Sequence, residues 1–397
     1  IRRQREMCIR DRIEDHLRRH AGILENAGTS LLITLPQGRN IARLLRALVR
    51  DLRDILALGD IEKEAAPAEP AQPDSGDIAF LQYTSGSTGD PKGVILTHAD
   101  LLANIRAMGE AARVTSRDVF VSWLPLYHDM GLIGAWLGSL YFGVKLVSMS
   151  PLAFLARPQR WLQAIHKYRG TLSAAPNFAY ELCLKRLSDA DLAGMDLRSW
   201  RWAFNGAEPV SAHTLQRFGE RFRQCGLRWQ ALAPVYGLAE AGVGLAFPPP
   251  ERGPRIDCID GTRFAKFRHA LRLPCSDPGA MQIVACGRPL PGDLLRVVDE
   301  EGRALPERHE GLLQFQGPSA TRGYYRNPEA TKRLIRNGWH DTGDRAYLAA
   351  GEVYLTGRVK DLIIRGGRNI YPYELEQAVG EIAGIRKGCV AAFAAAD

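Results

Sequence analysis

One stretch of the chain combines glycines, hydroxyl side chains and a lysine in a pattern that could bind phosphate. It runs Tyr-Thr-Ser-Gly-Ser-Thr-Gly-Asp-Pro-Lys-Gly-Val over residues 83–94. Gly86 and Gly89 allow backbone conformations that other residues resist, and therefore a close approach to phosphate. Successive backbone N–H groups can form a nest for an anion, and Lys92 adds a positive charge. The hydroxyl donors are Thr84, Ser85, Ser87 and Thr88.

Two other interpretations of this stretch are weaker. It is not the common P-loop, because that pattern requires Ser or Thr after the lysine, and Gly93 follows here. A flexible Ser/Gly linker would not be expected between an apolar strand and the run Pro-Lys-Gly-Val-Ile-Leu-Thr-His at residues 91–98. We therefore interpret residues 83–94 as a phosphate-binding loop.

Regular elements of an α/β fold are expected to hold this loop. The apolar run Ile78–Tyr83 predicts a strand that enters the loop, and His98–Ala112 predicts a helix that follows it. Val119–Leu124 predicts the next strand. Strands and helices then alternate to about Phe247, which predicts a mostly parallel sheet.

The regions on either side of this α/β part have other patterns. Upstream, Ser30–Leu35 predicts a strand and Asn40–Leu56 an amphipathic helix, and the Pro- and Ala-rich run Ala65–Asp77 predicts a linker. Downstream, short strands and turns over about residues 285–357 predict a β-rich subdomain, with a hairpin at Val298–Leu305. A helix is expected from Tyr373 to Gly380.

The composition excludes several classes of protein. The 397 residues are 46% hydrophobic and 24% charged, as in a folded globular chain, and the net charge is +8. The basic residues are scattered and no zinc-finger or RNA-recognition signature is present, so we expect no nucleic-acid partner. The apolar stretch Gly131–Met149 is interrupted by Lys145, which favours a buried helix followed by a strand over a transmembrane segment.

The cysteines and the N-terminus predict the compartment. Seven cysteines show no paired pattern and no Cys-x-x-Cys spacing, so we expect neither a disulfide framework nor a zinc site. Residues 1–12 are charged rather than apolar, so we expect no signal peptide. These features together predict a cytoplasmic protein.

Five further segments add polar, aromatic and small residues along the chain. They are Trp-Leu-Pro-Leu-Tyr-His-Asp-Met-Gly-Leu-Ile-Gly at 123–134, Asn-Gly-Ala-Glu-Pro-Val at 205–210, Val-Tyr-Gly-Leu-Ala-Glu at 235–240, Gly-Trp-His-Asp-Thr-Gly-Asp at 338–344 and Thr-Gly-Arg-Val-Lys-Asp-Leu-Ile-Ile-Arg-Gly-Gly-Arg-Asn-Ile-Tyr-Pro at 356–372. Taken singly, each has an ordinary structural interpretation. His128 could be a structural histidine, Glu208 and Pro209 the first turn of a helix, and Tyr236 a core aromatic.

Taken together and in this order, the loop and the five segments resemble the adenylate-forming superfamily. That superfamily includes acyl-CoA synthetases, fatty acyl-AMP ligases, peptide-synthetase adenylation domains and luciferases, and the resemblance covers about residues 22–397. The runs at 124–134 and 367–372 are similar to the fatty acyl-AMP ligase branch in particular. The resemblance implies an α/β fold in which a large domain of parallel-rich sheets and helices, with a β-rich subdomain, precedes a small α+β C-terminal domain.

The resemblance also implies an ATP site. The loop residues Thr84, Ser85, Gly86, Ser87, Thr88 and Gly89 would hold the phosphates together with Lys92. The carboxylate of Glu240 would bind Mg²⁺, a hard cation that prefers oxygen ligands. His128 would lie near the acid and the α-phosphate. The candidate catalytic residues are therefore Thr84, Lys92, His128 and Glu240.

Adenosine would be bound by residues from four of the other segments. Tyr236 could stack on adenine, since an aromatic face accepts a flat base. Asp344 would accept hydrogen bonds from both ribose hydroxyls, which suits an ionised carboxylate. The candidate nucleotide-binding residues outside the loop are Gly206, Ala207, Glu208, Tyr236, Gly237, Asp344 and Arg358.

The implied activity is the ATP-dependent activation of a long-chain fatty acid. Its carboxylate would attack the α-phosphate and release pyrophosphate, while Lys92, the loop amides and Mg²⁺ stabilise the developing charge. The acyl-adenylate would then pass to a phosphopantetheine thiol, on an acyl carrier protein or in CoA. A fatty acid–CoA ligase is the alternative enzyme, and an inactive fragment that only binds nucleotide is the alternative of another class.

The resemblance finally implies the domain boundaries. Residues 1–357 would form the large domain, and residues 358–397 the hinge at Asp361 and the start of the C-terminal domain. The phosphate loop comes early in the chain, and the family's C-terminal lysine would lie beyond Asp397, so we expect a fragment shortened at both ends. Such a chain should bind ATP weakly and form adenylate more slowly than a longer version.

Overall fold

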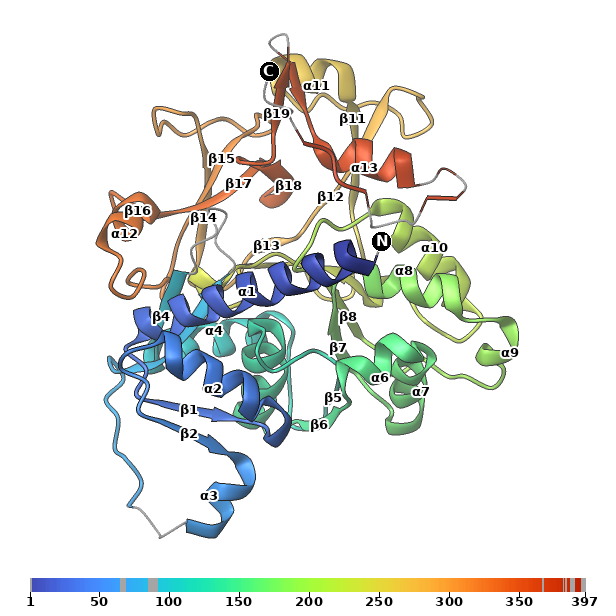
Figure 1. Cartoon of the computed structure of the whole chain (residues 1–397). Helices are drawn as coiled ribbons and strands as arrows, with labels where there is room; N and C mark the ends of the chain where they lie inside the picture. Colours follow the sequence, from blue (N-terminus) through green and yellow to red (C-terminus); the bar gives the residue numbers. More distant parts are fainter. Residues whose placement is uncertain are drawn as a thin grey trace. The chain divides into compact units, whose positions relative to one another are not determined.

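The chain forms two compact units that interleave in sequence. The computed structural model describes residues 2–64, 69–84, 92–365, 368–380, 382, 384–385 and 390–393. Unit one comprises Ile1–Ala99 and Thr321–Arg333, and unit two comprises Asp100–Ala320 and Leu334–Asp397. In Figure 1 most of unit one is coloured blue to cyan, and unit two runs from cyan to red.

Unit one begins with a long helix and a small parallel ribbon. Its elements are α1 (Arg2–Ala27), β1 (Leu31–Thr34), α2 (Arg39–Leu48), β2 (Asp54–Ala57) and α3 (Leu58–Glu64). The strand predicted at Ser30–Leu35 is confirmed. The helix predicted over Asn40–Leu56 is too long: it ends at Leu48, because Val49 is extended and residues 54–57 pair in parallel with β1. Residues 69–77 contain no helix or strand, as expected of a linker.

An antiparallel pair of strands brackets the phosphate loop. β3 (Ile78–Thr84) pairs with β4 (Lys92–Thr97), and the register places Thr84 opposite Lys92. The strand predicted to enter the loop is therefore confirmed. The segment 321–333, which returns to this unit late in the sequence, bonds to β4: the Tyr325 N–H donates to the Gly93 carbonyl at 2.8 Å.

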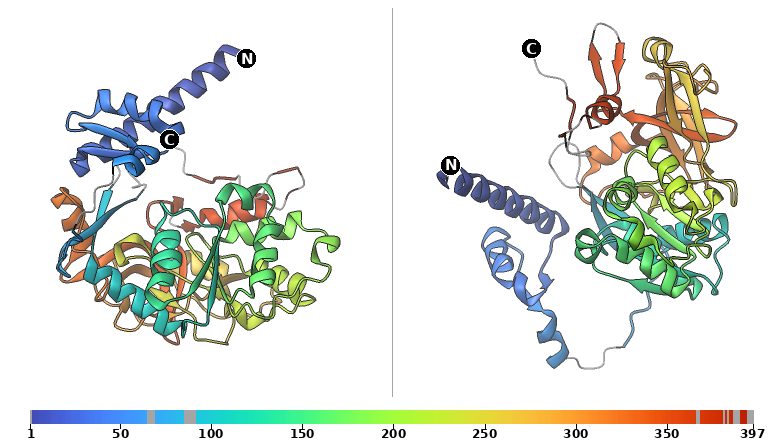
Figure 2. Two further views of the ribbon diagram at one scale, coloured as in Figure 1. Left: turned by 90° about the horizontal axis from the view of Figure 1, so that it is seen from below. Right: turned by 90° about the vertical axis from the view of Figure 1, so that its right-hand side faces the viewer.

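Unit two contains the predicted parallel sheet. Its strands follow the order β6-β5-β7-β8-β9, and all pairs are parallel. The strands are β5 (Val119–Ser122), β6 (Lys145–Ser148), β7 (Leu172–Ala175), β8 (Trp202–Asn205) and β9 (Leu232–Pro234). Helix α4 (His98–Ala111) precedes β5, and the helices between later strands are α6 (Pro151–Ala156), α7 (Gln159–Tyr168), α8 (Asn177–Arg186), α9 (Asp189–Leu192) and α10 (Ala212–Arg223). Helices α8 and α10 pack side by side (Figures 1 and 2).

The stretch Gly131–Met149 folds as predicted. A π-helix (Met130–Leu137) continues into α5 (Gly138–Phe142), and β6 follows. Among the described residues, no helix is long and apolar enough to cross a membrane.

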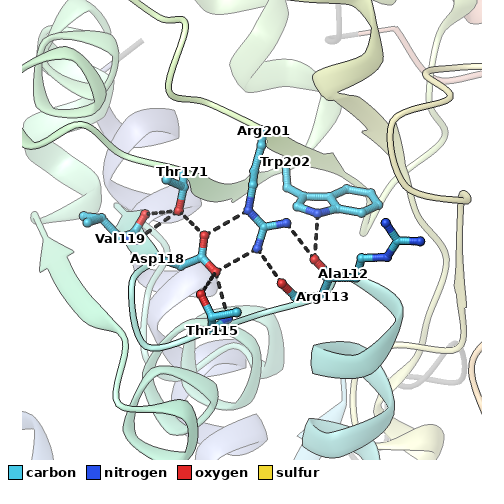
Figure 3. A network of polar contacts seen from close by, with 8 residues as sticks. All are labelled: Ala112, Arg113, Thr115, Asp118, Val119, Thr171, Arg201 and Trp202. Carbon is cyan, nitrogen blue, oxygen red and sulfur yellow. Dashed lines mark hydrogen bonds and ion pairs between the residues drawn. The ribbon is translucent and has the colours of Figure 1, made fainter.

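A buried ion pair ties the parallel sheet to the helix that precedes it. The Asp118 carboxylate, just before β5, accepts two hydrogen bonds from the Arg201 guanidinium, at 2.9 and 2.8 Å (Figure 3). Arg201 also donates to the Ala112 carbonyl at the end of α4. Thr171, just before β7, donates to Asp118 at 2.7 Å. The amino ends of β5, β7 and β8 are thus fixed to one another, which leaves their carboxyl ends for other roles.

We expect the Asp118→Asn variant to unfold more easily, by about 3 kcal/mol, because it leaves Arg201 without its ionic partner. Burial raises the pKa of Asp118, but hydrogen bonds from Arg201, Thr115 and Thr171 outweigh it, so the pKa lies below its usual value. A lowered pKa contributes stability above the unfolded-state value, near 4, which is lost as the pH falls through the folded-state value. Urea unfolding at pH 7 and below pH 4 should therefore show the difference shrinking in acid. An equal difference at both pH values would contradict this account.

The predicted β-rich part is present and consists of several sheets. The main sheet contains β14 (Leu294–Val298), β15 (Gly311–Gln316), β16 (Ile335–Arg336), β17 (Trp339–Ala349) and β18 (Glu352–Arg358). Val298 bridges to Ala304, which confirms the hairpin. Smaller pairs are β10 (Ala246–Phe247) with β13 (Arg288–Pro289), β11 (Ile256–Asp260) with β12 (Ala280–Val284), and β19 (Ile363–Arg365) with β20 (Arg368–Ile370). The remaining helices are α11 (Gly261–Phe267), α12 (Pro328–Leu334) and α13 (Pro372–Gly380), the last as predicted.

The cysteines correct one expectation. Cys258, on β11, forms a disulfide with Cys275, so the prediction that the chain has no disulfide was wrong. No paired spacing indicates this bond, because the two residues are brought together where the chain returns beside β11 and the Leu273 N–H donates to the Cys258 carbonyl at 2.9 Å. Cys183, Cys225 and Cys286 are buried free thiols, and burial raises the pKa of each. None of these three is poised as a thiolate nucleophile.

Candidate active site

Three of the candidate segments follow the carboxyl ends of parallel strands. Residues 123–129 follow β5, residues 206–208 follow β8, and residues 235–240 follow β9. In open α/β sheets, ligands bind at this edge. The strand order therefore places these segments at the same edge of the sheet, although the first and the last lie more than 100 residues apart in the sequence.

The segment after β8 is shaped by close packing. A Cβ on Gly206 would lie 2.9 Å from Val235 Cγ2 and 3.0 Å from the Val235 carbonyl oxygen, so only glycine fits. Ala207 adopts a positive φ of 66°, which turns the chain sharply outward. The buried Asn205, two residues before Ala207, donates to Asn177 Oδ1 at 3.2 Å and so helps to fix the start of this turn. This Asn–Asn hydrogen bond was not predicted from the sequence, although an asparagine at the end of an apolar strand could have indicated it.

Glu208 corrects a structural interpretation. Residues 208–209 are not the first turn of a helix, because α10 begins at Ala212 and is capped by the Ser211 hydroxyl. The Glu208 carboxylate instead accepts a hydrogen bond from the Phe178 N–H in the first turn of α8. A carboxylate at a helix N-terminus is favoured by the exposed amides and the helix dipole.

Tyr236 bonds to Asp344 across unit two. The Tyr236 hydroxyl donates to Asp344 Oδ2 at 2.6 Å, and its ring is only 7% exposed. The ring packs in the apolar cluster with Leu245, Leu313 and Phe315. The core interpretation of Tyr236 therefore holds, while stacking on adenine stays a prediction. The next residue, Gly237, leaves no room for a Cβ, which would lie 1.7 Å from the Val243 carbonyl oxygen.

Asp344 is the centre of a polar group at the edge of β17. Arg358, its cross-strand partner on β18, places Nε 3.6 Å from Asp344 Oδ1. Burial raises the pKa of Asp344, and the nearby negative charges of Glu240 and Asp341 act in the same direction. The Tyr236 hydrogen bond and the Arg358 charge oppose this rise without cancelling it. The structure thus brings together four sequence-predicted residues: Tyr236, Glu240, Asp344 and Arg358.

We expect Tyr236→Phe to raise the pKa of Asp344 further, because the hydrogen bond from the hydroxyl stabilises the ionised carboxylate and is lost in the variant. A carboxyl-carbon NMR titration, with the Asp344 signal assigned from an Asp344→Asn sample, would measure the change. Tyr354→Phe is a matched control, since that tyrosine lies in a different apolar cluster of the same unit. A pKa of Asp344 that is unchanged or lower in Tyr236→Phe would contradict the assigned hydrogen bond.

His128 is an ion-pair partner of its neighbour in the chain. His128 Nδ1 lies 2.7 Å from Asp129 Oδ1, and the imidazole is about half exposed, with 48% of its side chain accessible. The hydrogen bond and charge of Asp129 raise the pKa of His128, although burial lowers it. The purely structural interpretation of His128 does not fit this exposure well. A half-exposed imidazolium beyond the end of β5 could attract an anionic group.

Asp129→Asn should lower the pKa of His128, because it removes the carboxylate that stabilises the protonated ring. Proton NMR of the imidazole resonances across pH 5–9 would record the shift. A midpoint for His128 that stays in place would show that Asp129 does not set its charge.

The phosphate loop itself lies outside the described residues. This concerns Ser85, Gly86, Ser87, Thr88 and Gly89, whose expected roles stay predictions. Its two anchors in unit one are described: Thr84 ends β3, and Lys92 begins β4 with Nζ 5.2 Å from the centre of the Tyr324 ring.

The proposed hinge is placed only in part, and so are two apolar segments, Gly131–Leu140 and Ala174–Leu184, whose sequence fits either the lining of an acyl tunnel or the core. Asp361 is exposed and its N–H donates to the Arg358 carbonyl at 3.2 Å, while residues 366–367 lie outside the described residues. Most apolar side chains of Ala174–Leu184 belong to the core of unit two. Phe178, at 43%, and Leu140, at 65%, are the more exposed apolar residues of the two segments considered for the tunnel.

Comparison with known proteins agrees with this geometry. The AMP-binding enzyme family matches residues 16–325, and the chain belongs to that family. It is 34% identical over 385 residues to a medium-chain-fatty-acid–[acyl-carrier-protein] ligase of Teredinibacter turnerae, covering 89% of this chain and 58% of that protein. It is 40% identical over 356 residues to a 4-hydroxyphenylalkanoate adenylyltransferase of Mycobacterium marinum, covering 85% of this chain and 56% of that protein.

A solved structure shares the fold over nearly the whole chain. It comes from a study of fatty acyl-adenylate ligases from E. coli and L. pneumophila, with a TM-score of 0.89 and 34% identity, and the match covers 94% of this chain and 67% of that one. The fold is thus the α/β adenylate-forming fold. The chain spans less than three-fifths of the length of the two curated relatives named above.

Proposed function

We propose that this chain carries the nucleotide-binding core of an enzyme that activates a fatty acid as an acyl-adenylate. The observation that carries the proposal is the group formed by Tyr236, Glu240, Asp344 and Arg358, which the fold assembles from three separate segments. A half-buried carboxylate next to an arginine suits a ligand that offers hydroxyl donors and negative charge, such as the ribose phosphate of ATP. Family membership supports the same reading.

Residues of this group, and His128 and Lys92 outside it, have separate roles in this proposal. Asp344 accepts the ribose hydroxyls, and Tyr236 holds that carboxylate in place and ionised. Arg358 adds a positive charge beside it. His128 attracts the carboxylate of the acid, and Lys92 with residues 84–89 contacts the phosphates. The reaction joins a carboxylate oxygen to the α-phosphorus and breaks the bond to pyrophosphate, so no oxidant or reductant is needed.

The single carboxylate of Glu240 suits a magnesium ion that arrives bound to ATP. Within the described part of the chain, no cluster of three or more His, Cys, Asp or Glu side chains could hold a metal. Mg²⁺ commonly uses one or two protein carboxylates and completes its shell with phosphate oxygens and water. Glu240 would supply that single carboxylate, and the ion would neutralise charge on the phosphates.

The acceptor and the acid are inferred from relatives. The Teredinibacter protein is named for transfer to an acyl carrier protein, which favours a carrier-bound phosphopantetheine over CoA. The Mycobacterium marinum relative is named for a phenylalkanoate, so an aryl acid is the second candidate substrate. A fatty acid–CoA ligase remains the alternative enzyme.

Domain roles and location complete the proposal. Residues 1–357 form the large domain, and rotation about Asp361 moves the segment 358–397. A cytoplasmic location is part of the proposal, and the Cys258–Cys275 disulfide is the observation that opposes it. The thiol state of these two cysteines in freshly lysed cells would decide the point.

The proposal is tested by exchange of labelled pyrophosphate into ATP, measured with a panel of fatty acids and 4-hydroxyphenylalkanoates. We expect exchange that depends on the fatty acid and on Mg²⁺. Lys92→Ala and Asp344→Asn should each reduce the exchange rate by about 100-fold, since each removes charge stabilisation or positioning of ATP. Asp299→Asn, on an exposed turn, is the matched control. ATP binding without any exchange, with every acid, would favour the inactive nucleotide-binding fragment.

A further inference from the structure

Unit two contains one loop with a strong excess of positive charge. The segment between the two disulfide-bonded cysteines holds a single acidic residue, Asp260, and its carboxylate caps α11 by accepting from the Arg263 N–H at 2.9 Å. We call residues 261–272 the basic loop. Its cationic side chains are Arg263, Lys266, Arg268 and Arg272.

The charges of the basic loop are largely available to a partner. Arg263 and Lys266 are exposed, and neither forms an ion pair with another described residue. Arg268 and Arg272 approach the carboxylates of Glu300 and Asp257 only at 3.7 and 3.6 Å. The Arg268–Glu300 pair is long and exposed, and the buried Asp257 already accepts hydrogen bonds from Arg308 and Tyr347, so a partner could compete for both arginines.

An exposed aromatic side chain lies within the same surface. Phe267, the last residue of α11, is 57% exposed, and Lys266 Nζ lies 5.1 Å from its ring centre. Aromatic and arginine side chains are enriched in protein interfaces, where a few of them supply most of the binding energy. The combination of Phe267 with surrounding cations is therefore typical of a protein-binding surface.

The backbone beneath these side chains is firmly held. Phe264 and Ala270 are fully buried in an apolar cluster with Tyr347 and Tyr371. The Asp260 N–H donates to the Leu271 carbonyl at 2.8 Å, and the disulfide closes the ends of the segment. A preformed surface loses little conformational entropy when it binds.

The basic loop is also connected to the candidate active site. Phe264 lies edge-on to Tyr347, with ring centres 6.1 Å apart, and the Tyr347 hydroxyl donates to Asp257 at 2.7 Å. Tyr347 and Asp344 lie on the same strand, β17, about 10 Å apart along it. A protein bound to the basic loop would thus contact a segment that packs against β17, the strand that carries Asp344.

We propose that the basic loop is the docking surface for an acidic face of the acyl carrier protein that receives the acyl group. This inference rests on the proposed function, which names that carrier as the acceptor. Opposite charge would speed the encounter and select acidic partners, and Phe267 would supply the apolar contact at the centre.

The experiment measures the affinity of the chain for a purified, strongly acidic holo carrier protein by isothermal titration. Arg263→Glu with Lys266→Glu should weaken binding about tenfold or more and reduce its dependence on salt. Phe267→Ala, which keeps the charge, should weaken it as well. The control is Arg157→Glu with Arg160→Glu, the same charge change at exposed positions of unit two near the start of α7, and it should bind like the parent chain.

A second readout separates this proposal from the proposed function. Pyrophosphate exchange requires no carrier and none of the three variants alters a residue of the candidate nucleotide site, so the exchange rate should be the same in the parent chain and in all three variants. Equal weakening of carrier binding by the loop and control variants would overturn the docking surface. Loss of exchange in the loop variants alone would assign the loop a structural role instead. If the parent shows no exchange but the loop variants still lose carrier binding, the proposed function fails and the docking surface stands.

Discussion

The hydrogen bond between Tyr236 and Asp344 is the interaction on which the candidate site depends. Tyr236 follows a strand of the parallel sheet, whereas Asp344 belongs to the antiparallel β17, and 108 residues separate them. The bond places a carboxylate, an arginine and a second carboxylate at one edge of unit two. It also counteracts the effect of burial on Asp344, which would otherwise favour the protonated acid. An ionised carboxylate is the better acceptor for hydroxyl donors, so the packing around Asp344 affects what it can bind.

The two ends of the parallel sheet have different tasks. At the amino ends, the Asp118–Arg201 pair and Thr171 bind three strands and α4 together with well-formed hydrogen bonds. At the carboxyl ends, small and polar residues follow the strands, and Ala207 adopts a positive φ of 66°. Rigidity at one edge allows the other edge to present residues to a ligand. This division is common in α/β proteins, where function concentrates beyond the carboxyl ends of the strands.

Much of this arrangement could be predicted from the sequence, and the failures have physical reasons. Apolar runs and their spacing predicted the strands at Ser30–Leu35 and Ile78–Tyr83, because the pattern that indicates a strand is contained within a few consecutive residues. The helix predicted over Asn40–Leu56 was too long, since the pairing of residues 54–57 with β1 is a tertiary effect. The Cys258–Cys275 disulfide and the Asn205–Asn177 contact depend on how distant segments meet. The resemblance placed Tyr236 and Asp344 in one site, but their direct bond could only be seen in three dimensions.

We propose, as the central point, that the nucleotide site of this chain serves to join an oxygen of a carboxylic acid to the α-phosphorus of ATP. The most direct measurement uses a fatty acid labelled with oxygen-18 in its carboxyl group, followed by mass spectrometry of the AMP released after transfer to a thiol. Attack on the α-phosphate leaves one acid oxygen on phosphorus when the acyl group departs, so the AMP should carry one labelled oxygen. Unlabelled AMP, or label in released inorganic phosphate, would contradict the account.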